Sequence, residues 1–344
     1  MSDVRLADLV TFANGKARPS EGTGYPTYGS NGVIGSSPRH NTGPHVTVIG
    51  RVGSYCGAVH YSDGRCWVTD NAIVATPRAG VNPRYVYYLL KRLDLNRYRI
   101  GSGQPLLTQG LLNRLTVPRM TRREQDAAAS LLGALDDKIA VNAHIAALAD
   151  ELVRARHREL ARTTAGTVPL GDLGALVGAY VSAERIGPDE NYIALEHMPK
   201  RHMWLSTWTD SSAVTSGKRR FRPGDVLFGK LRPYFHKVGL TFVDGVASTD
   251  ILVVRPKEAA HRGWLLAALS SDEVVAHASV VGDGTRMPRA KWADIAAYEI
   301  PWGAGQARDL NGLVNSLATR VEAAAFETGT LTRLRDTLLP TLIP

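Results

Sequence analysis

The sequence has little cysteine. Only two of its 344 residues are cysteines, Cys56 and Cys66. A disulfide framework would need more thiols in a chain of this length, so we expect a reducing, cytoplasmic environment. Cys56, His60 and Cys66 could supply metal ligands, but a fourth ligand is missing and their spacing matches no familiar zinc pattern. The sequence therefore predicts neither disulfides nor a metal site.

Long hydrophobic runs are absent as well. No apolar stretch reaches the roughly 20 residues that cross a bilayer as a helix. The first ten residues, MSDVRLADLV, lack the basic and then apolar plan of a signal peptide. We expect no membrane segment and no export. Hydrophobic content of 44% and charged content of 21% are ordinary for a globular protein, and the chain is long enough for two domains with cores.

Familiar catalytic motifs are missing. The chain contains no H-E-x-x-H, no G-x-S-x-G, no Walker A sequence and no Asn-Pro-Pro-Tyr type methyltransferase motif. Pro188-Asp189 and Glu196 begin a nuclease-like pattern, but residue 198 is Met where that pattern needs Lys. These absences predict a protein without catalytic residues. An enzyme acting on nucleic acid through an unrecognised site stays open as an alternative.

Basic residues outnumber acidic ones. The 41 Lys and Arg exceed the 32 Asp and Glu, which leaves a net charge of +9 and a pI of about 9.6. Residues 218–237 carry seven basic side chains against one acid, Asp225, and residues 84–119 carry seven against Asp94. Such clusters favour a polyanionic partner, usually nucleic acid, over a basic surface that only keeps the protein dissolved.

The sequence contains an internal repeat. Four blocks recur in the same order: VRLADLVTF (4–12) as VPLGDLGALV (168–177), VTVIGRVGSYCGAV (46–59) as DVLFGKLRPYFHKV (225–238), TDNAIVATP (69–77) as TDILVVRP (249–256), and GSGQPLLTQGLLNRLTVP (101–118) as GDGTRMPRAKWADIAAYEIP (282–301). The period is that of a whole domain, so we predict a tandem duplication.

The second pair of blocks shares one frame. Gly50 aligns with Gly229, Arg51 with Lys230, Gly53 with Arg232, Tyr55 with Tyr234 and Val59 with Val238. Each copy thus carries a basic residue and a tyrosine just after a strand-like run. The polar residues differ between the copies, and we predict two recognition modules that read different short sequences.

A long helix is expected after each module. From Glu124 to about Thr163 there is no proline, and Thr121 with Glu124 forms a candidate capping box. The second helix should run from about Gln306 to Leu339. Both carry an apolar seam with the alternating spacing of a coiled coil, which includes Leu132, Leu135, Ile139, Leu317, Val321, Leu331 and Leu338. The matched seams favour two antiparallel helices packed on each other; the alternative is that each helix packs on its own domain.

The globular parts are expected to be mixed α/β. Runs such as VTVIG, AIVAT, VLFGK and ILVVR predict strands, and residues 85–93 and 264–278 predict short helices. We therefore predict two similar globular DNA-recognition domains separated by two long antiparallel coiled-coil helices. The expected boundaries are 1–122 and 165–303 for the domains, and 123–164 and 304–344 for the helices.

Candidate DNA contacts are the basic, aromatic and polar side chains of the shared strands and of the glycine-containing loops, because such side chains bind phosphates and base edges. The candidates are Arg51, Tyr55, Arg97, Arg99, Gln104, Lys218, Arg219, Arg220, Lys230, Arg232, Tyr234, His236, Lys237, Thr285, Arg286, Arg289 and Lys291.

These features resemble the specificity (S) subunit of type I restriction–modification systems. The resemblance rests on FGKLRPYFHK, STDILVV, the transition GSGQ…LLNRLTVPRMTRREQ and the helix segment LLGALDDKIAVNAHIAALADEL. It covers nearly the whole chain as two target-recognition domains, each followed by a conserved helix. The second copy keeps Gln306 but lacks the glutamate that precedes the corresponding glutamine of the first copy.

The resemblance implies a non-catalytic subunit that reads a bipartite, gapped site in double-stranded DNA. It implies two modification subunits as partners, which bind S-adenosylmethionine and methylate adenine, and a restriction subunit that can join them with ATP and Mg. No cofactor would bind this chain. Helix residues such as Asp136, Asp137, Arg154 and Arg158 would face a protein partner. A stand-alone or phage-defence DNA-binding protein built from the same module is the alternative.

Overall fold

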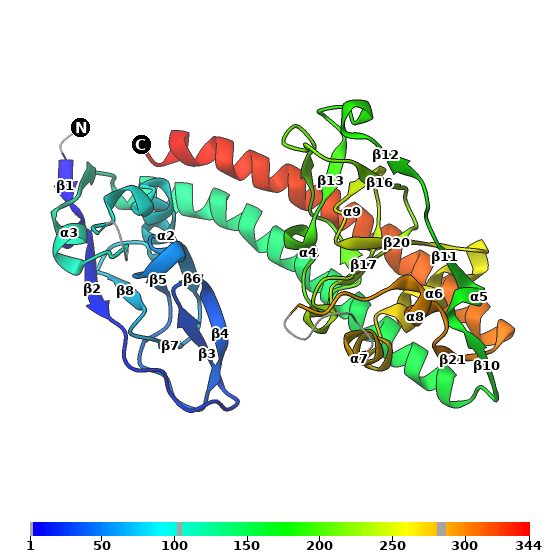
Figure 1. Ribbon diagram of the computed structural model, residues 1–344. Coiled ribbons are helices and arrows are strands. Elements are labelled where there is room, and N and C mark those ends of the chain that lie inside the picture. The colour runs from blue at the N-terminus through cyan, green and yellow to red at the C-terminus, as the bar shows by residue number, and fades with distance from the viewer. Residues whose placement is uncertain (1–2, 102–104, 281–286) are drawn as a thin grey trace. The chain divides into compact units, whose positions relative to one another are not determined.

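The computed structural model describes residues 3–101, 105–280 and 287–344 (Figure 1). The chain divides into two compact units. The first unit comprises Met1–Lys138 with Thr330–Pro344, and the second comprises Ile139–Gly329. Each unit combines helices with sheets, so the predicted mixed class is confirmed. The division passes through both long helices, whereas the sequence predicted helices and domains as separate segments.

The first unit contains strands in three sheets. β1 (Asp3–Arg5) pairs with β9 (Thr116–Pro118); a second sheet has the order β2 (Val10–Asn14), β8 (Ala72–Pro77), β5 (Val46–Gly50), β6 (Val59–Ser62); a third has the order β4 (Gly32–Ser37), β3 (Tyr25–Gly29), β7 (Trp67–Val68). The helices are α1 (Leu6–Leu9), α2 (Pro83–Arg92), α3 (Gln109–Arg114) and the first part of α4 (Arg122–Arg162).

The second unit has a matching set of elements. β10 (Gly166–Pro169) pairs with β21 (Glu299–Trp302); the next sheet has the order β11 (Gly174–Leu176), β20 (Ile251–Pro256), β17 (Val226–Gly229), β18 (Val238–Thr241), β14 (Trp204–Leu205); the third has the order β12 (Tyr180–Val181), β16 (Lys218–Phe221), β19 (Gly245–Ala247), β13 (Asn191–Ile193), β15 (Thr209–Asp210). The helices are the second part of α4, α5 (Leu170–Leu173), α6 (Arg262–Leu269), α7 (Asp272–Val280), α8 (Trp292–Ala296) and most of α9 (Ala304–Leu342).

The repeat is visible in the strand order. The order β2-β8-β5-β6 of the first unit corresponds to β11-β20-β17-β18 of the second. The strands predicted from the four β-branched runs are β5, β8, β17 and β20, and all four lie inside these sheets. The expected helix over 85–93 is α2, while residues 264–278 form α6 and α7 in place of one helix.

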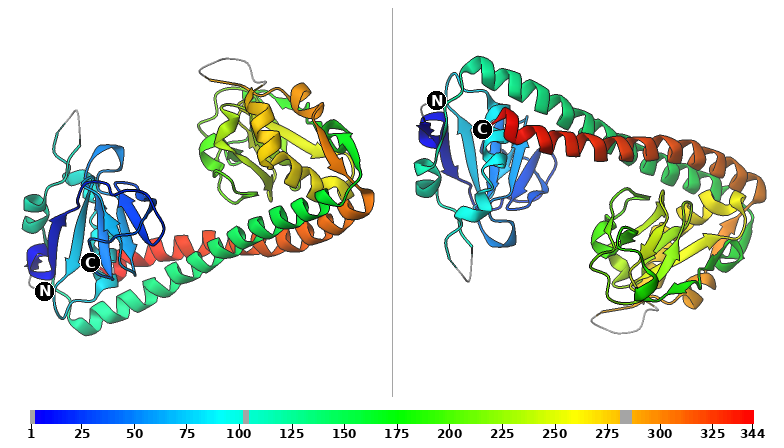
Figure 2. Two further views of the ribbon diagram at one scale, coloured as in Figure 1. Left: turned by 90° about the horizontal axis from the view of Figure 1, so that it is seen from below. Right: turned by 90° about the horizontal axis from the view of Figure 1, so that it is seen from above.

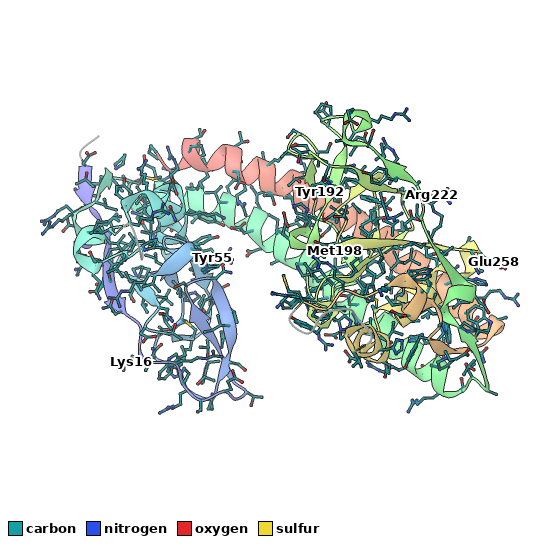
Figure 3. All side chains as sticks on the ribbon, viewed as in Figure 1. Lys16, Tyr55, Tyr192, Met198, Arg222 and Glu258 are labelled. Carbon is teal, nitrogen blue, oxygen red and sulfur yellow. The ribbon has the colours of Figure 1, made fainter. Side chains whose placement is uncertain are left out.

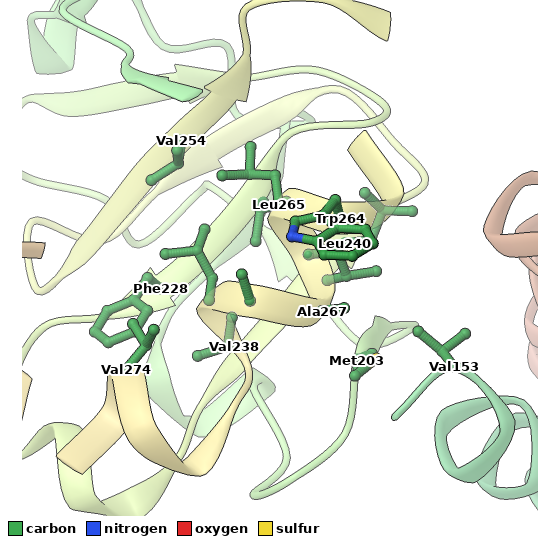
Figure 4. Packing of buried hydrophobic residues seen from close by; sticks show 14 of the residues in the cluster. Val153, Met203, Phe228, Val238, Leu240, Val254, Trp264, Leu265, Ala267 and Val274 are labelled. Atoms are coloured by element: carbon green, nitrogen blue, oxygen red, sulfur yellow. The ribbon is translucent and has the colours of Figure 1, made fainter. Parts of the chain in front are cut away.

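Period-two burial explains how each main sheet lies between two layers. In β17, Val226 and Phe228 point into a core shared with α6, and Leu227 points into a core shared with the smaller sheet. Every residue of this strand is buried, which is the pattern of a strand covered on both faces. Figure 4 shows Trp264 of α6 packed near Leu240 and Leu265, with Phe228 and Val238 in the same cluster.

Local signals set the ends of the helices. At the start of α2, the Asn82 side chain accepts a hydrogen bond from the Tyr85 amide, and Pro83 stands in the first turn. At the start of α4, the Thr121 amide donates to Glu124 Oε2 at 2.6 Å and the Glu124 amide donates to Thr121 Oγ1 at 3.3 Å. The predicted capping box is therefore confirmed.

The long helices pack on each other and on the domain cores. In the second unit, Asn142 of α4 donates to the Ala324 carbonyl of α9 at 3.2 Å and to Glu327 Oε2 at 2.8 Å. In the first unit, Arg335 of α9 donates to Asp136 of α4 at 2.7 Å. The predicted seam positions are all buried or half-buried: Leu132, Leu135, Ile139, Leu317, Val321, Leu331 and Leu338. The two long helices thus pack on each other, and they also pack on the domain cores.

The last turns of α9 belong to the core of the first unit. Leu339 and Ile343 are buried there with residues of α1 and α2. Both views of Figure 2 show the red end of α9 beside the strands of this unit. Among the helices of the described residues, none is long and apolar enough to cross a membrane.

Candidate nucleic-acid interface

A turn with the same backbone hydrogen bonds follows β5 and β17. We call Arg51–Cys56 the first turn and Lys230–Phe235 the second turn. In the first turn, Arg51 N donates to Asn71 O at 2.9 Å, Leu107 N to Arg51 O at 3.0 Å, and Gly53 N to Pro105 O at 3.3 Å. In the second turn, Lys230 N donates to Asp250 O at 2.9 Å, Ala290 N to Lys230 O at 2.9 Å, and Arg232 N to Pro288 O at 2.8 Å. The duplication therefore conserves the backbone of the turn while its side chains differ.

Left-handed backbone conformations occur at matching places in the two turns. Gly53 has a φ of 72° and its counterpart Arg232 has 51°. Gly57 has a φ of 92° and its counterpart His236 has 54°. A non-glycine residue in this region costs roughly 1–2 kcal/mol. The second turn therefore keeps the glycine conformation of the first with two larger side chains. A glycine in one copy is a sequence signal for this conformation in the other.

One tyrosine projects from each turn. Tyr55 is 53% exposed and Tyr234 is 52% exposed, and both lie in short 3-10 segments, Gly53–Tyr55 and Pro233–Phe235. Figure 3 marks Tyr55. The Tyr234 ring contacts the Phe235 ring at a centroid distance of 4.9 Å. Exposed rings on a basic surface are suited to stack on bases or to pack against sugars.

The basic side chains of the two turns differ in the hydrogen bonds that they make within the protein. Arg51 Nη1 lies 3.4 Å from the Asp70 carbonyl, and among the described residues its buried Nε has no hydrogen-bond partner. The Arg232 Nε is also buried and has no hydrogen-bond partner in the part of the chain that the structure describes. Within the residues that the structure describes, the Lys230 ammonium group makes no hydrogen bond or ion pair. Lys230 is half-buried and carries its charge beside the exposed Tyr234.

Arg97 and Arg99 lie next to the first turn. Asn96 Nδ2 donates to the Cys56 carbonyl at 2.8 Å, which joins the 3-10 segment Leu95–Tyr98 to that turn. Both arginines are exposed; Arg97 donates to the Tyr98 hydroxyl at 2.7 Å and Arg99 to Asn96 Oδ1 at 2.7 Å. The structure thus brings together these arginines, which the sequence places far from the turn.

Arg289 and Lys291 flank the second turn. The amide of Ala290, between them, donates to the Lys230 carbonyl at 2.9 Å. Arg289 lies 3.6 Å from Asp250 and its side chain is 53% exposed. Lys291 is exposed. Both cations therefore border the same surface as Lys230 and Tyr234.

Two predicted DNA contacts need correction. Lys218 is 6% exposed, its ammonium group donates to the Ser216 carbonyl at 2.8 Å, and it lies 5.9 Å from the ring centroid of Tyr192, which Figure 3 labels. His236 is 2% exposed and its Nε2 lies 2.8 Å from the Ser270 carbonyl oxygen. Side chains this buried cannot touch a ligand at the surface without a rearrangement. Their roles in this structure are internal.

Three more predicted contacts hold partners inside the protein. Arg219 donates to the Val177 carbonyl at 3.0 Å. Arg220 pairs with Glu190 at 2.5 and 3.1 Å, which raises the pKa of Arg220 and lowers the pKa of Glu190. Lys237 donates to the Leu195 carbonyl at 2.5 Å, and burial lowers its pKa. These bonds limit how far the three cations can turn toward DNA.

Gln104, Thr285 and Arg286 lie outside the described residues, so the predicted loop contacts stay predictions. No group of three or more His, Cys, Asp or Glu side chains that could hold a metal occurs over the described ranges. Cys56 and Cys66 are free and buried.

Several helix residues expected to face a protein partner are used internally. The Asp136 carboxylate accepts hydrogen bonds from the Tyr88 hydroxyl at 2.7 Å and from Arg335. Burial raises the pKa of Tyr88, and the hydrogen bond to Asp136 raises it further. Asp137 pairs with Arg84 at 2.7 Å. Arg154 donates to the Ser270 carbonyl at 2.5 Å. The bonds of Asp136 and Arg154 limit what these two side chains can offer a partner, whereas Asp137, although paired with Arg84, and Arg158 are exposed, so the expected partner contacts stay a prediction.

Comparisons with known proteins agree with the resemblance seen in the sequence. Residues 1–149 match the family model of the type I restriction modification DNA specificity domain. The chain is 34% identical over 128 residues to the type I restriction enzyme EcoprrI specificity subunit of Escherichia coli, a match covering 36% of this chain and 32% of that protein. It is 27% identical over 116 residues to the EcoDI specificity subunit of the same organism, covering 30% of this chain and 25% of that protein.

These sequence matches span about a third or less of each curated relative. Among solved structures, the S subunit of a type I restriction-modification system from M. genitalium superposes with a TM-score of 0.65 at 15% identity, covering 100% of this chain and 96% of that chain. At this identity the superposition establishes a common fold over the full length.

Proposed function

The chain belongs to the type I restriction–modification DNA specificity family through its residues 1–149, and on that premise we propose that it is a DNA-reading subunit with two heads. The first head is centred on the first turn and the second on the second turn. Each head reads one half of a bipartite, gapped site in double-stranded DNA. The chain directs adenine methylation, or restriction, by partner subunits and carries no catalytic residue itself.

The duplicated turn is the observation that carries this proposal. Its backbone hydrogen bonds are the same in both units, while Arg51 is replaced by Lys230 and Gly53 by Arg232. A constant frame with variable side chains is what two readers of different sequences need. Exposed Tyr55 and Tyr234 occupy equal positions in the two frames. The same frame with the same side chains would instead predict a palindromic site.

The surrounding charge supports DNA as the ligand. The chain carries a net charge of +9, and Arg97, Arg99, Arg289 and Lys291 border the two turns. Cations at the border of a reading site hold phosphates and thereby set the position of the reader on the duplex. S-adenosylmethionine, ATP and Mg belong, in this proposal, to two modification subunits and to a restriction subunit.

The test is methylation of a randomised-site DNA library by the chain together with its modification partner. We expect two short, unrelated half-sites around an unread gap of several base pairs. A palindromic motif or a continuous one would contradict the two-headed reader. Methylation without sequence preference would contradict the specificity function as a whole.

A further inference from the structure

His236 is buried beneath the second turn although its backbone is unfavourable for a histidine. Its φ of 54° matches Gly57 in the other unit, where no side chain is needed. The ring is 2% exposed, and its Nε2 lies 2.8 Å from the carbonyl oxygen of Ser270 at the end of α6. A carbonyl only accepts, so Nε2 carries the proton and donates it. The side chain therefore anchors the turn at a cost in backbone strain.

The same carbonyl receives a second donor from the long helix α4. Arg154 Nη1 donates to the Ser270 oxygen at 2.5 Å, and Arg154 Nη2 lies 3.3 Å from the carbonyl of Arg201. The Arg201 amide in turn donates to the His236 carbonyl at 2.8 Å. His236 is thus tied by its ring and by its backbone to two groups that α4 also holds.

A further contact from α4 fixes the segment next to Arg201. Asp150 Oδ1 accepts from the Met203 amide at 3.0 Å, and Asp150 Oδ2 lies 3.1 Å from His202 Nδ1. Asp150 is 4% exposed. Asp272 lies 3.5 Å from His236 Nδ1 and 2.9 Å from Arg201. The whole network lies within the second unit and ends at the turn that carries Lys230, Arg232 and Tyr234.

We propose that His236 is a positioning residue for base reading: it fixes the second turn, and with it Lys230, Arg232 and Tyr234, to helix α4 through the Ser270 carbonyl. The inference rests on the proposed function. Reading a base edge requires a side chain held within a few tenths of an ångström of its place. The first turn has glycine at the matching position and no such anchor, so the device belongs to the second head.

His236→Gly is the sharpest test, because glycine accepts the left-handed backbone and removes only the ring. The randomised-site methylation assay is run on the full complex. We expect the half-site read by the second head to lose roughly tenfold in discrimination at one position or more, the size of one good base contact. The half-site of the first head should stay unchanged, and a melting measurement should show that the variant is still folded at the temperature of the assay.

His45→Gly is the matched control, since His45 also has a positive φ, 57°, but an exposed side chain at the far end of β5 from the first turn. It should change neither half-site. An unchanged motif with His236→Gly, or equal relaxation of both half-sites, would overturn the proposal while leaving the two-headed reader intact. If His236→Gly unfolds, His236→Asn, which tolerates the same backbone, carries the same expectations. A wild-type complex without a gapped motif would instead refute the proposed function.

Discussion

At the scale of single residues, burial on α4 shifts two titratable groups. His157 is largely shielded, its ring packs edge-on against Trp264 at a centroid distance of 4.8 Å, and its Nε2 has no hydrogen-bond partner within the described ranges. Burial lowers the pKa of His157 to about 4. Burial raises the pKa of Asp150 to about 6, in spite of the Met203 amide and His202 beside it. The lowered pKa of His157 makes the folded protein less stable as the pH falls, whereas the raised pKa of Asp150 makes it more stable. Only a comparison between variants therefore isolates the contribution of either group.

His157→Phe should change how stability depends on pH. The unfolded histidine binds a proton with a pKa near 6.5, while the folded one does so only near pH 4. The stability contributed by neutral His157 is therefore present above pH 6.5 and is lost as the pH falls toward 4, by up to about 3 kcal/mol. Compared with wild type, His157→Phe should gain relative stability between pH 7 and pH 4.5 in urea unfolding. His144→Phe, an exposed histidine of α4, is the control and should show no such trend.

Lys230→Ala combined with Arg232→Gly tests direct reading by the second head. Glycine is chosen for residue 232 because Gly53 holds the same conformation in the first turn. If the side chains read bases, only one half-site should relax, by roughly 1–3 kcal/mol for each lost bidentate contact. Arg51→Ala should relax the other half-site alone. Weaker binding to all sequences alike, with a smaller salt dependence, would show that Lys230 and Arg232 hold phosphates.

At the scale of the elements, the long helices combine an apolar seam with a buried polar residue. Asn142 is 2% exposed and donates to Ala324, Glu327 and Thr328 across the helix pair. The Nδ2 group of Asn142 finds these acceptors in one register only, so Asn142 selects the alignment of α4 with α9. The seam itself supplies the stability, because its other residues are mainly aliphatic.

Two adjacent leucines of α4 differ in burial, because one lies in the apolar seam and the other at the surface. Leu132 is fully buried and Leu131 is 45% exposed. Leu132→Glu places an unpaired charge in the core of the first unit and should cost roughly 3–5 kcal/mol of unfolding free energy. Leu131→Glu should change it by less than about 0.5 kcal/mol. Thermal and denaturant unfolding of both variants measures the difference, and similar losses in the two would mean that the seam is misassigned.

At the scale of the whole molecule, residues from both ends of the sequence build one core. Leu6 near the start and Ile343 near the end are fully buried in the same cluster of the first unit. The duplicated halves are therefore not two independent segments of chain. Each unit contains parts of both long helices, and the first unit is complete only with Thr330–Pro344.

Ile343→Ala should destabilise the first unit. Removing a fully buried side chain of this size costs about 2–5 kcal/mol. Leu334→Ala, in α9 just before Ile343 but at a residue 46% exposed, is the matched control and should cost less than about 0.5 kcal/mol. Hydrogen exchange of β5 and α2 reports on the first unit. Unchanged protection in Ile343→Ala would contradict the packing of α9 on that unit.

DNA binding by the complex should weaken steeply with salt. If the cations around the two turns make six to ten phosphate contacts, affinity should fall roughly 10³- to 10⁵-fold between about 50 and 200 mM salt. Titration of the complex of this chain with its modification partner measures the slope. A flat response would contradict a basic DNA-binding surface.

The sequence by itself determined the features that depend on local pattern. The repeat, the strands β5, β8, β17 and β20, the capping box and the seams of α4 and α9 follow from composition and spacing, because neighbouring residues alone fix periodicity and caps. The same reading placed Arg51, Tyr55, Lys230 and Tyr234 at equivalent positions, and the structure puts them in equal turns.

Only the tertiary structure decided what each cation touches. Lys218, Arg219 and Lys237 look like surface charges in the sequence, yet they donate to the carbonyls of Ser216, Val177 and Leu195. The sequence predicted that His236 contacts DNA, yet its side chain is buried against the end of α6. Such partners come mostly from strands and loops distant in sequence. A side chain turns inward when a buried carbonyl there lacks a donor, and no local pattern records which carbonyls those are.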